Sequence, residues 1–257
     1  MPQRQGKSMN QAEGKLQNKK ETLDSRKPES YKIFDDIAGT YDFLNRILSF
    51  GIDVYWRKKM TKKLPQRKNL QALDLATGTA DVALTLSKQP QIAHVKGLDL
   101  SKEMIAIGRK KVEKANKRGL ISLDIGDGTQ IEAEDESFDV ATISFGIRNF
   151  SDPDKSLRDI YRVLKPEGRL LILEFSLPKN RLVRAVYFFY FRNLLPWIGN
   201  LVSKHKDAYT YLNESVEHFP YGKEFAQKME NANFKNVTYT PLTFGIATLY
   251  CGDKKDS

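Results

Sequence analysis

Acidic and small residues follow the short apolar runs of this chain, at positions where side chains and free backbone N–H groups could bind a ligand. The first apolar run, 72–76, breaks at the small residues 77–79 before a helical pattern resumes over 80–87. Small residues at such a strand-to-helix turn let a ligand approach the backbone, and the N–H groups at the helix start are free to bind it. The next run, 94–100, contains Asp99, which stands 20 residues beyond the turn. A carboxylate at that spacing typically accepts hydrogen bonds from ribose hydroxyls, with capping of the next helix as the alternative.

Two further runs end in residues of the same kind. The run 120–125 leads into Gly126-Asp127-Gly128, whose carboxylate suits recognition of a base edge or its amino group. A plain turn explains these three residues nearly as well. The run 138–146 leads into three polar residues: Ser144, Arg148 and Asn149. Because ligands bind at the carboxyl edge of open α/β sheets, these side chains are expected where the chemistry takes place.

The spacing of apolar and turn-forming residues predicts strands that alternate with helices. Strands are predicted over 72–76, 94–100, 120–125, 138–146 and 169–175, and helices over 80–87, 101–117, 152–164, 209–219 and 222–232. Short, almost continuously apolar strands are typical of parallel strands covered on both faces. Residues 165–168 are predicted to form a turn, and the last segments, 236–242 and 245–251, an antiparallel pair. The pattern therefore predicts an α/β fold with a mostly parallel sheet.

Helical segments outside this alternation are candidates for a lid over the ligand site. Residues 31–64 begin with an amphipathic pattern in which aromatic side chains are interleaved with polar ones such as Asn45. Residues 181–202 are aromatic, apolar and basic, and Pro196 is expected to kink or end their helix. Packing on the sheet as a helical cap or second core is the alternative for each segment.

Composition narrows the class of protein. The 257 residues include 42 Lys+Arg against 32 Asp+Glu, a net charge of +10 that would serve nucleic acid, an anionic membrane surface or solubility alone. Residues 1–30 are predicted to be a disordered basic tail, which leaves 31–257 as one domain. A single cysteine and three scattered histidines argue against a disulfide framework and against a metal site. The absence of a secretory signal, and of an apolar run near the ~20 residues that cross a bilayer, predicts a cytoplasmic protein.

The glycine pattern of the first turn distinguishes two kinds of cofactor. A dinucleotide fold would carry Gly-x-Gly-x-x-Gly between its first strand and helix. Here Asp74-Leu-Ala-Thr-Gly-Thr-Ala80 contains one glycine and offers no pyrophosphate site. A cofactor with adenosine and no phosphate fits better, which indicates S-adenosylmethionine.

Seven segments carry a closer resemblance. They are Tyr41-Asp-Phe-Leu-Asn45, Leu48-Ser-Phe-Gly-Ile52, Leu73-Asp-Leu-Ala-Thr-Gly-Thr79, Ile143-Ser-Phe-Gly-Ile-Arg-Asn149, Tyr161-Arg-Val-Leu-Lys-Pro166, Leu173-Glu-Phe-Ser176 and Tyr209-Thr-Tyr-Leu-Asn-Glu-Ser215. With them the chain resembles the menaquinone/ubiquinone C-methyltransferases, a family of class I S-adenosylmethionine-dependent methyltransferases. It departs from the pattern at Thr77 and Ala80, where relatives often carry glycine.

The resemblance implies a Rossmann-like class I methyltransferase fold. Its seven-stranded sheet would be mostly parallel with an antiparallel edge strand, and helical lid elements would lie at about 31–64 and 181–219. Cofactor contacts are implied for a set of residues on the loops: Gly78, Thr79, Asp99, Asp127, Gly128 and Ser144. Substrate contacts are assigned to four residues of the lid and fourth-strand segments: Tyr41, Asn45, Asn149 and Tyr211.

The implied reaction moves the sulfonium methyl group to a ring carbon of a prenylated quinol, most closely demethylmenaquinol. The ring carbon is nucleophilic enough only in the reduced, preferably deprotonated quinol, and ionising a phenol of pKa ~10 at neutral pH costs roughly 4 kcal/mol. A guanidinium beside the oxygen would lower that cost, so Arg148 is the candidate catalytic residue, with a water, a nearby acid or a tyrosine accepting the proton. Arg148 itself stays charged and is a poor base.

The sequence alone leaves three other functions open. Methylation of a benzoquinol in ubiquinone synthesis uses the same chemistry on another head group. An RNA methyltransferase would fit the basic charge, but no nucleic-acid motif accompanies it, so no nucleic-acid partner is expected. A cofactor-binding scaffold without methyl transfer is the non-enzymatic alternative. A lipophilic substrate implies peripheral contact with the inner face of the cell membrane, and a homodimer is left open.

Overall fold

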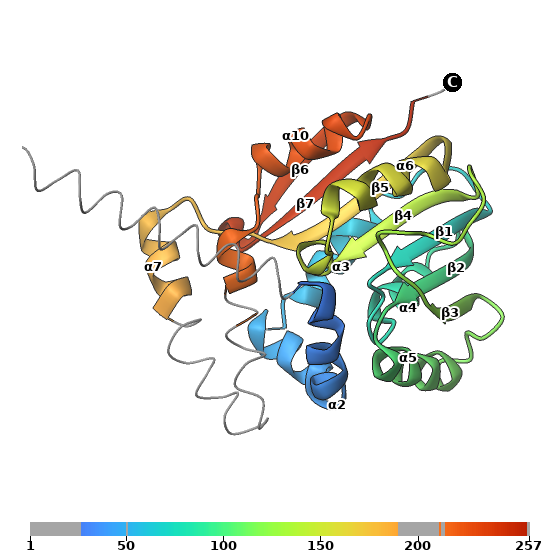
Figure 1. The fold of residues 1–257 in the computed structure, drawn as a ribbon, viewed down its shortest axis with the longest axis horizontal. Coiled ribbons are helices and arrows are strands. Elements are labelled where there is room, and N and C mark those ends of the chain that lie inside the picture. The colour runs from blue at the N-terminus through green and yellow to red at the C-terminus, as the bar shows by residue number, and fades with distance from the viewer. Residues whose placement is uncertain (1–26, 50, 190–210, 212–213, 256–257) are drawn as a thin grey trace, which may run out of the picture.

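A seven-stranded sheet forms the centre of the molecule in the computed structural model, which describes residues 27–49, 51–189, 211 and 214–255 (Figure 1). The strands are β1 (Leu70–Leu75), β2 (Ile92–Asp99), β3 (Ile121–Ile125), β4 (Phe138–Ser144), β5 (Leu164–Phe175), β6 (Lys235–Leu242) and β7 (Ala247–Asp253). Their order across the sheet is β3-β2-β1-β4-β5-β7-β6. β1 to β5 pair in parallel, while β7 runs antiparallel to both β5 and β6. The predicted mostly parallel sheet with an antiparallel edge is therefore confirmed.

Helices cover both faces of this sheet, which explains why its strands are apolar on both sides (Figure 1). The helices are α2 (Ser30–Leu48), α3 (Asp53–Thr61), α4 (Asp81–Leu86), α5 (Lys102–Lys114), α6 (Pro153–Val163), α7 (Arg181–Phe189) and α10 (Lys223–Asn231). Side chains of α3, α4 and α5 join one buried cluster, and those of α6 and α10 join the other. Successive residues of β5 alternate between the two clusters, as a pleated strand requires.

The expected helix starts follow from their capping residues. Ser101 accepts a hydrogen bond from the N–H of Met104 at the start of α5, and Asp152 accepts one from Lys155 at the start of α6. Pro153 occupies the first turn of α6, where its missing N–H costs nothing. These caps define where the loops at the carboxyl ends of β2 and β4 give way to helix.

The turn predicted at 165–168 is wrong as a chain reversal. These residues belong to the start of β5, and the pairing of β4 with β5 shifts register there, from Phe138 opposite Leu164 to Val140 opposite Arg169. Glu167 adopts a φ of +58°, which a wide irregularity in the strand accommodates. The residues that resemble a turn therefore form a bulge within a strand.

The predicted lid segments are helical where the structure describes them. α2 and α3 occupy the segment predicted at 31–64, and α7 is the described part of 181–202. Pro196 lies outside the described residues, as do four positions of the helix predicted at 209–219. The described positions 211 and 214–218 of that helix are helical. Residues 27–30, predicted to belong to the tail, form a 3-10 turn and the start of α2. None of the helices in the described ranges combines the length and apolarity that a bilayer-spanning segment requires.

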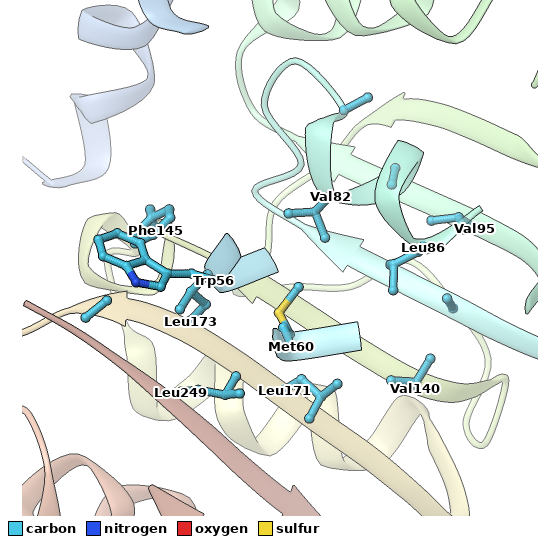
Figure 2. Packing of buried hydrophobic residues seen from close by; sticks show 14 of the residues in the cluster. Trp56, Met60, Val82, Leu86, Val95, Val140, Phe145, Leu171, Leu173 and Leu249 are labelled. Carbon is cyan, nitrogen blue, oxygen red and sulfur yellow. The ribbon is translucent and has the colours of Figure 1, made fainter. Parts of the chain in front are cut away.

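Trp56 anchors α3 on the end of the sheet (Figure 2). Its indole is fully buried, with ring centroids 5.9 Å from Phe145 and 6.3 Å from Phe175. Its Nε1–H donates to the hydroxyl of Thr243 at 2.8 Å. Because burial and the hydrogen bond both hold the indole, the residues next to it on α3 have fixed positions at the carboxyl edge.

Asp74 is a buried carboxylate on β1, beneath the loop that follows this strand. It accepts hydrogen bonds from the hydroxyls of Thr77 and Thr142, both at 2.6 Å. Burial raises the pKa of its carboxyl to about 6, because loss of solvent outweighs these two hydrogen bonds. The folded state thus binds the proton more tightly than the unfolded chain, whose Asp pKa is ~3.9. This contribution to stability is present below about pH 4 and is lost as the pH rises through 6.

We therefore expect the Asp74→Asn variant to lose this pH dependence. An amide stays neutral, and the two threonine hydroxyls can rotate to suit it. The variant should exceed the parent chain in free energy of unfolding by up to ~3 kcal/mol at pH 8, and by much less at pH 4.5. Urea unfolding at the two pH values measures the difference. An equal difference at both values would contradict the assignment.

Candidate active site

A cavity of about 880 Å³, measured with its open mouth, lies at the carboxyl ends of the parallel strands. The loops after β1, β2, β3 and β4 form its floor, and the start of α2 covers it. We call it the main cavity; it is lined by Lys27, Ser30, Tyr31, Phe34, Tyr41, Ala76, Gly78, Asp99, Leu100, Met104, Gly126, Asp127, Gly128, Phe145, Gly146, Asn149, Phe150 and Ser151. Six of the residues predicted for the site are therefore brought together by the fold.

Asp99 connects the first two loops of the cavity. One carboxylate oxygen accepts the N–H of Gly78 at 2.8 Å, and the other accepts the N–H of Ser101 at 2.9 Å. Burial raises the pKa of its carboxyl, and the backbone hydrogen bonds oppose that rise. Each oxygen keeps a second acceptor position, so the carboxylate can hold two ligand hydroxyls while it holds the loop.

The loop after β1 adopts an unusual backbone conformation. Ala76, Gly78 and Ala80 have φ values of +50°, +54° and +68°. This tight turn is held from within, because the N–H groups of Thr77 and Gly78 donate to the Leu98 carbonyl and the Asp99 carboxylate. Relatives often carry glycine at position 80, and the left-handed backbone there explains why. Alanine adopts this conformation at a cost of order 1 kcal/mol.

The loop after β3 closes the opposite side of the cavity. Asp127 accepts hydrogen bonds from the N–H and hydroxyl of Thr129 at 2.8 and 2.9 Å through one oxygen, so its other oxygen is available to a ligand. Gly128 lies against Phe150, where a Cβ atom would come within 2.5 Å of the ring. The carbonyl of Gly128 accepts from the buried hydroxyl of Ser156 at 2.6 Å, which fixes the loop on α6.

We expect the Gly128→Ala variant to bind its cofactor about tenfold more weakly, or ~1.4 kcal/mol. The new methyl group would occupy the cavity wall and displace the Phe150 ring, which lines the same cavity. Titration calorimetry measures the dissociation constant. Gly119→Ala is the matched control, because its Cβ atom would meet nothing within 4 Å. Equal affinities of the two variants would contradict the role of Gly128.

A smaller hollow adjoins the main cavity. This side compartment is lined by Tyr41, Asp42, Asn45, Arg57, Ala76, Thr77, Gly78, Thr79, Asp81, Val82, Ser144 and Phe145. Tyr41, Ala76, Gly78 and Phe145 line both spaces, so the two are contiguous. Thr79, Asn45 and Ser144, predicted for the site, face this compartment rather than the main cavity.

The hydroxyl of Thr79 is held by charged side chains. It donates to Asp42 at 2.5 Å and accepts from the ammonium group of Lys111 at 3.0 Å. Lys111 also pairs with Asp42 at 2.9 Å and with Asp81. The Thr79 side chain thus ties the loop to α2 and α5, which leaves its backbone as the part that can meet a ligand.

Two arginines extend this ionic network through the lid. Arg57 pairs with Asp81 and Asp53, each at 2.8 Å, and Arg46 pairs with Asp53 at 3.0 Å. The charges of Arg57 and Lys111 lower the pKa of Asp81 although burial raises it. The sequence offered no signal for this network beyond the charged residues interleaved in α2 and α3, because its partners come from four different helices.

Arg148 forms a buried ion pair with Glu174, a partner that its sequence position did not reveal. Its NH1 group lies 2.6 Å from a Glu174 oxygen and 2.7 Å from the carbonyl of Phe145, and its Nε donates to Ser215 at 3.3 Å. Burial raises the pKa of Glu174, and the Arg148 charge opposes that rise. Arg148 lines neither hollow, and the buried Tyr211 lines neither as well.

Buried polar atoms without partners mark where a ligand would complete the site. In the part of the chain that the structure describes, four such atoms lie at this edge: Arg57 Nε, Ser144 Oγ, Asn149 Oδ1 and Glu174 Oε2. Native proteins leave few buried polar groups without a hydrogen-bond partner, so each of these atoms requires an explanation. Together with the Asp99 and Asp127 carboxylates, they fit a cofactor that has hydroxyl, amino and carboxylate groups and no phosphate.

Comparison with known proteins agrees with this geometry. Residues 20–254 match the model of the ubiE/COQ5 methyltransferase family. The chain is 46% identical over 224 residues to the ubiquinone/menaquinone biosynthesis C-methyltransferase UbiE of Geotalea daltonii, which covers 87% of this chain and 95% of the relative. It is 43% identical over 223 residues to the demethylmenaquinone methyltransferase of Thermus thermophilus, covering 86% and 100%.

Solved structures share the fold. A possible histamine N-methyltransferase from Thermotoga maritima superposes with a TM-score of 0.61 at 20% identity, over 88% of this chain and all of the other. A putative methyltransferase bound to the Trm112 activator of Haloferax volcanii gives a TM-score of 0.63 at 18% identity, over 86% and 97%. The fold and the family match lead to one conclusion: the chain belongs to the ubiE/COQ5 methyltransferase family and uses S-adenosylmethionine as its cofactor.

Proposed function

We propose that the protein methylates a ring carbon of a prenylated naphthoquinol, demethylmenaquinol, in the last step of menaquinone biosynthesis. Relatives named for this reaction and for the wider ubiquinone/menaquinone pathway align with nearly the whole domain. The observation that carries the proposal is the 143–149 segment, whose buried arginine lies at the strand edge beside the cofactor site. The ring centroids of its aromatic neighbours Phe145 and Phe175 lie 4.4 Å apart. These two rings would form an apolar surface beside a ring substrate.

The side chains around this wall supply what the reaction needs. S-adenosylmethionine, when bound, supplies the methyl group. Glu174 and Ser215 hold the Arg148 NH1 and Nε groups, so its NH2 group is the one we assign to stabilising the quinolate oxygen. Such a contact favours the ionised quinol. Glu174 keeps the guanidinium in place.

Methyl transfer to defined acceptors tests the proposal. The full chain is incubated with labelled S-adenosylmethionine and reduced demethylmenaquinone, a reduced 2-methoxy-6-polyprenyl-benzoquinone, or RNA. We expect label in the naphthoquinol product. Preferred labelling of the benzoquinol would assign the protein to ubiquinone synthesis, and labelling of RNA alone would overturn a quinol substrate altogether.

We also propose that the protein collects its substrate at an anionic membrane surface, through α7 and a nearby turn. Leu182 and Val186 on α7 are exposed to 75% and 63%, and basic residues (Lys179, Arg181 and Arg184) surround them. Apolar side chains flanked by cations suit the boundary between lipid headgroups and acyl chains.

The nearby turn presents Phe244, which is 79% exposed. Thr243, Phe244 and Gly245 all have positive φ values, 44°, 57° and 89°, and such a conformation costs about 1 kcal/mol or more per non-glycine residue. Its neighbour Ser176 donates a hydrogen bond to the Gly245 carbonyl at 2.8 Å, so the turn lies against the segment that leads into α7. Because this turn is strained and still exposes a phenyl ring to solvent, it supports the proposal that this surface contacts lipid.

We expect the Leu182→Ser/Val186→Ser/Phe244→Ser variant to bind vesicles that contain phosphatidylglycerol at least tenfold more weakly, since each side chain would otherwise bury apolar area worth ~1 kcal/mol or more. Sedimentation with vesicles measures this. Ile125→Ser is the control, because Ile125 is 52% exposed on β3, at the other edge of the sheet. Equal binding of both variants would contradict the assigned surface.

A further inference from the structure

Arg57 is a buried cation on the lid helix α3 whose hydrogen bonding is incomplete. Its side chain is 8% exposed, and its two terminal nitrogens pair with Asp81 and Asp53. The N–H of its third nitrogen, Nε, is buried and has no partner among the described residues. The ion pairs account for the two terminal nitrogens, but they leave a donor unsatisfied in a place where desolvation makes that costly.

The position of Arg57 is fixed from both sides. The neighbouring Trp56 is fully buried in the core, which sets the angle of α3 at the carboxyl edge (Figure 2). Asp81, at the start of α4, ties the guanidinium to the end of the first loop. Arg57 therefore lines the side compartment together with the loop residues Gly78 and Thr79 and with Ser144. The buried Ser144 hydroxyl likewise has no partner within the described ranges.

The two adjoining hollows differ in chemistry. The main cavity carries the carboxylates of Asp99 and Asp127, which suit ribose hydroxyls and a base amino group. The side compartment carries the carboxylates of Asp42 and Asp81, both paired with cations, and it adds a guanidinium N–H and a hydroxyl. It adjoins the main cavity at the residues that line both, Gly78 among them. S-adenosylmethionine has the same division, with adenosine at one end and an amino acid at the other.

We propose that Arg57 binds the carboxylate of the cofactor's amino-acid end in the side compartment. The proposal rests on the cofactor of the family and not on the identity of the quinol. The ionic network around Arg57 contains three cations (Arg46, Arg57 and Lys111) and three carboxylates (Asp42, Asp53 and Asp81). A zwitterionic amino acid adds no net charge to this balanced network, whereas a lone anion or cation would.

Arg57 would thereby couple cofactor binding to the lid. The same guanidinium holds Asp53 on α3 and Asp81 on α4, so a carboxylate on Nε fixes the lid helix against the first loop. S-adenosylhomocysteine carries the same carboxylate as S-adenosylmethionine. Loss of Arg57 should consequently weaken both by the same factor, which separates this role from one at the sulfonium methyl group.

Binding of ligands that differ only in the carboxylate tests the proposal. Titration calorimetry compares S-adenosylmethionine with its decarboxylated form on the parent chain and on Arg57→Gln and Arg57→Lys. We expect Arg57→Gln to lose 10- to 100-fold in affinity for S-adenosylmethionine, as for a lost hydrogen bond to a charged group, and threefold or less for the decarboxylated form. Arg57→Lys, which keeps the charge and lacks Nε, should lose less.

Arg109→Gln is the matched control. Arg109 pairs with Asp124 outside this network, is 59% exposed and lines neither hollow, so its loss should leave both affinities unchanged. Equal losses for the two ligands on Arg57→Gln, including loss of all binding, would overturn the proposal, as would unchanged affinity for S-adenosylmethionine. A smaller loss for S-adenosylhomocysteine than for S-adenosylmethionine would also overturn it.

Discussion

The Asp99→Ala variant is expected to bind S-adenosylmethionine about 100-fold more weakly than the parent chain. The carboxylate accepts the N–H groups of Gly78 and Ser101 on one side and faces the main cavity on the other. Its removal deletes the acceptors for the ribose hydroxyls, each hydrogen bond to a charged group being worth ~1.5–3 kcal/mol. It also releases the loop after β1, whose left-handed residues need this support.

Asp99→Asn separates these two effects. The amide preserves the size of the side chain and one acceptor, so we expect a loss of about tenfold. Asp124→Asn is the control, because Asp124 is exposed on β3 and pairs with Arg109 at 3.5 Å, away from the main cavity. Calorimetric titration gives the three dissociation constants. An alanine variant that binds the cofactor within threefold of the parent would refute the ribose assignment.

The sequence was sufficient to predict the parts of the site that local pattern determines. Asp99, Asp127 and Ser144 follow or end apolar strands, and parallel strands bring their carboxyl ends to one edge, so three residues far apart in sequence could be placed together. The helix caps at Ser101 and Asp152 are equally local, because each bonds to an N–H three residues along.

Contacts between segments that are distant in sequence could not be predicted from local sequence pattern. Arg57 stands 24 residues from Asp81, and Lys111 pairs with Asp42 across 69 residues. No periodicity in the sequence encodes which charged residues pair. The irregular start of β5 was likewise missed, because Lys-Pro-Glu-Gly has turn chemistry and only the register against β4 makes it a bulge.

The ion pair of Arg148 is the most consequential of these hidden contacts, and it changes how an Arg148→Leu variant should be read. Both side chains are at most 3% exposed. Removing the arginine leaves Glu174 charged and buried without its partner, which costs ~3–5 kcal/mol. Lost turnover in this variant would therefore have two causes, a weaker fold and a missing catalytic group.

A double variant separates the causes. In Arg148→Leu/Glu174→Leu neither charge is buried alone, so most of the lost stability should return, whereas turnover should stay at least 100-fold below that of the parent because no guanidinium faces the quinolate. Urea unfolding and methyl transfer under saturating S-adenosylmethionine measure the two quantities. Turnover that recovers along with stability would show that Arg148 serves the fold alone.

The pH dependence of the single variant offers an independent check on the pair. Burial already raises the pKa of Glu174, and loss of the Arg148 charge removes what opposes that rise. A carboxyl whose pKa is higher in the folded state stabilises the fold at low pH and less as the pH rises through that pKa. Arg148→Leu should thus approach the parent's free energy of unfolding near pH 5 and fall furthest behind it at pH 8. The double variant, which has no carboxyl at this position, should not fall behind the parent as the pH rises. A fall of equal size in both variants would place its source elsewhere in the protein.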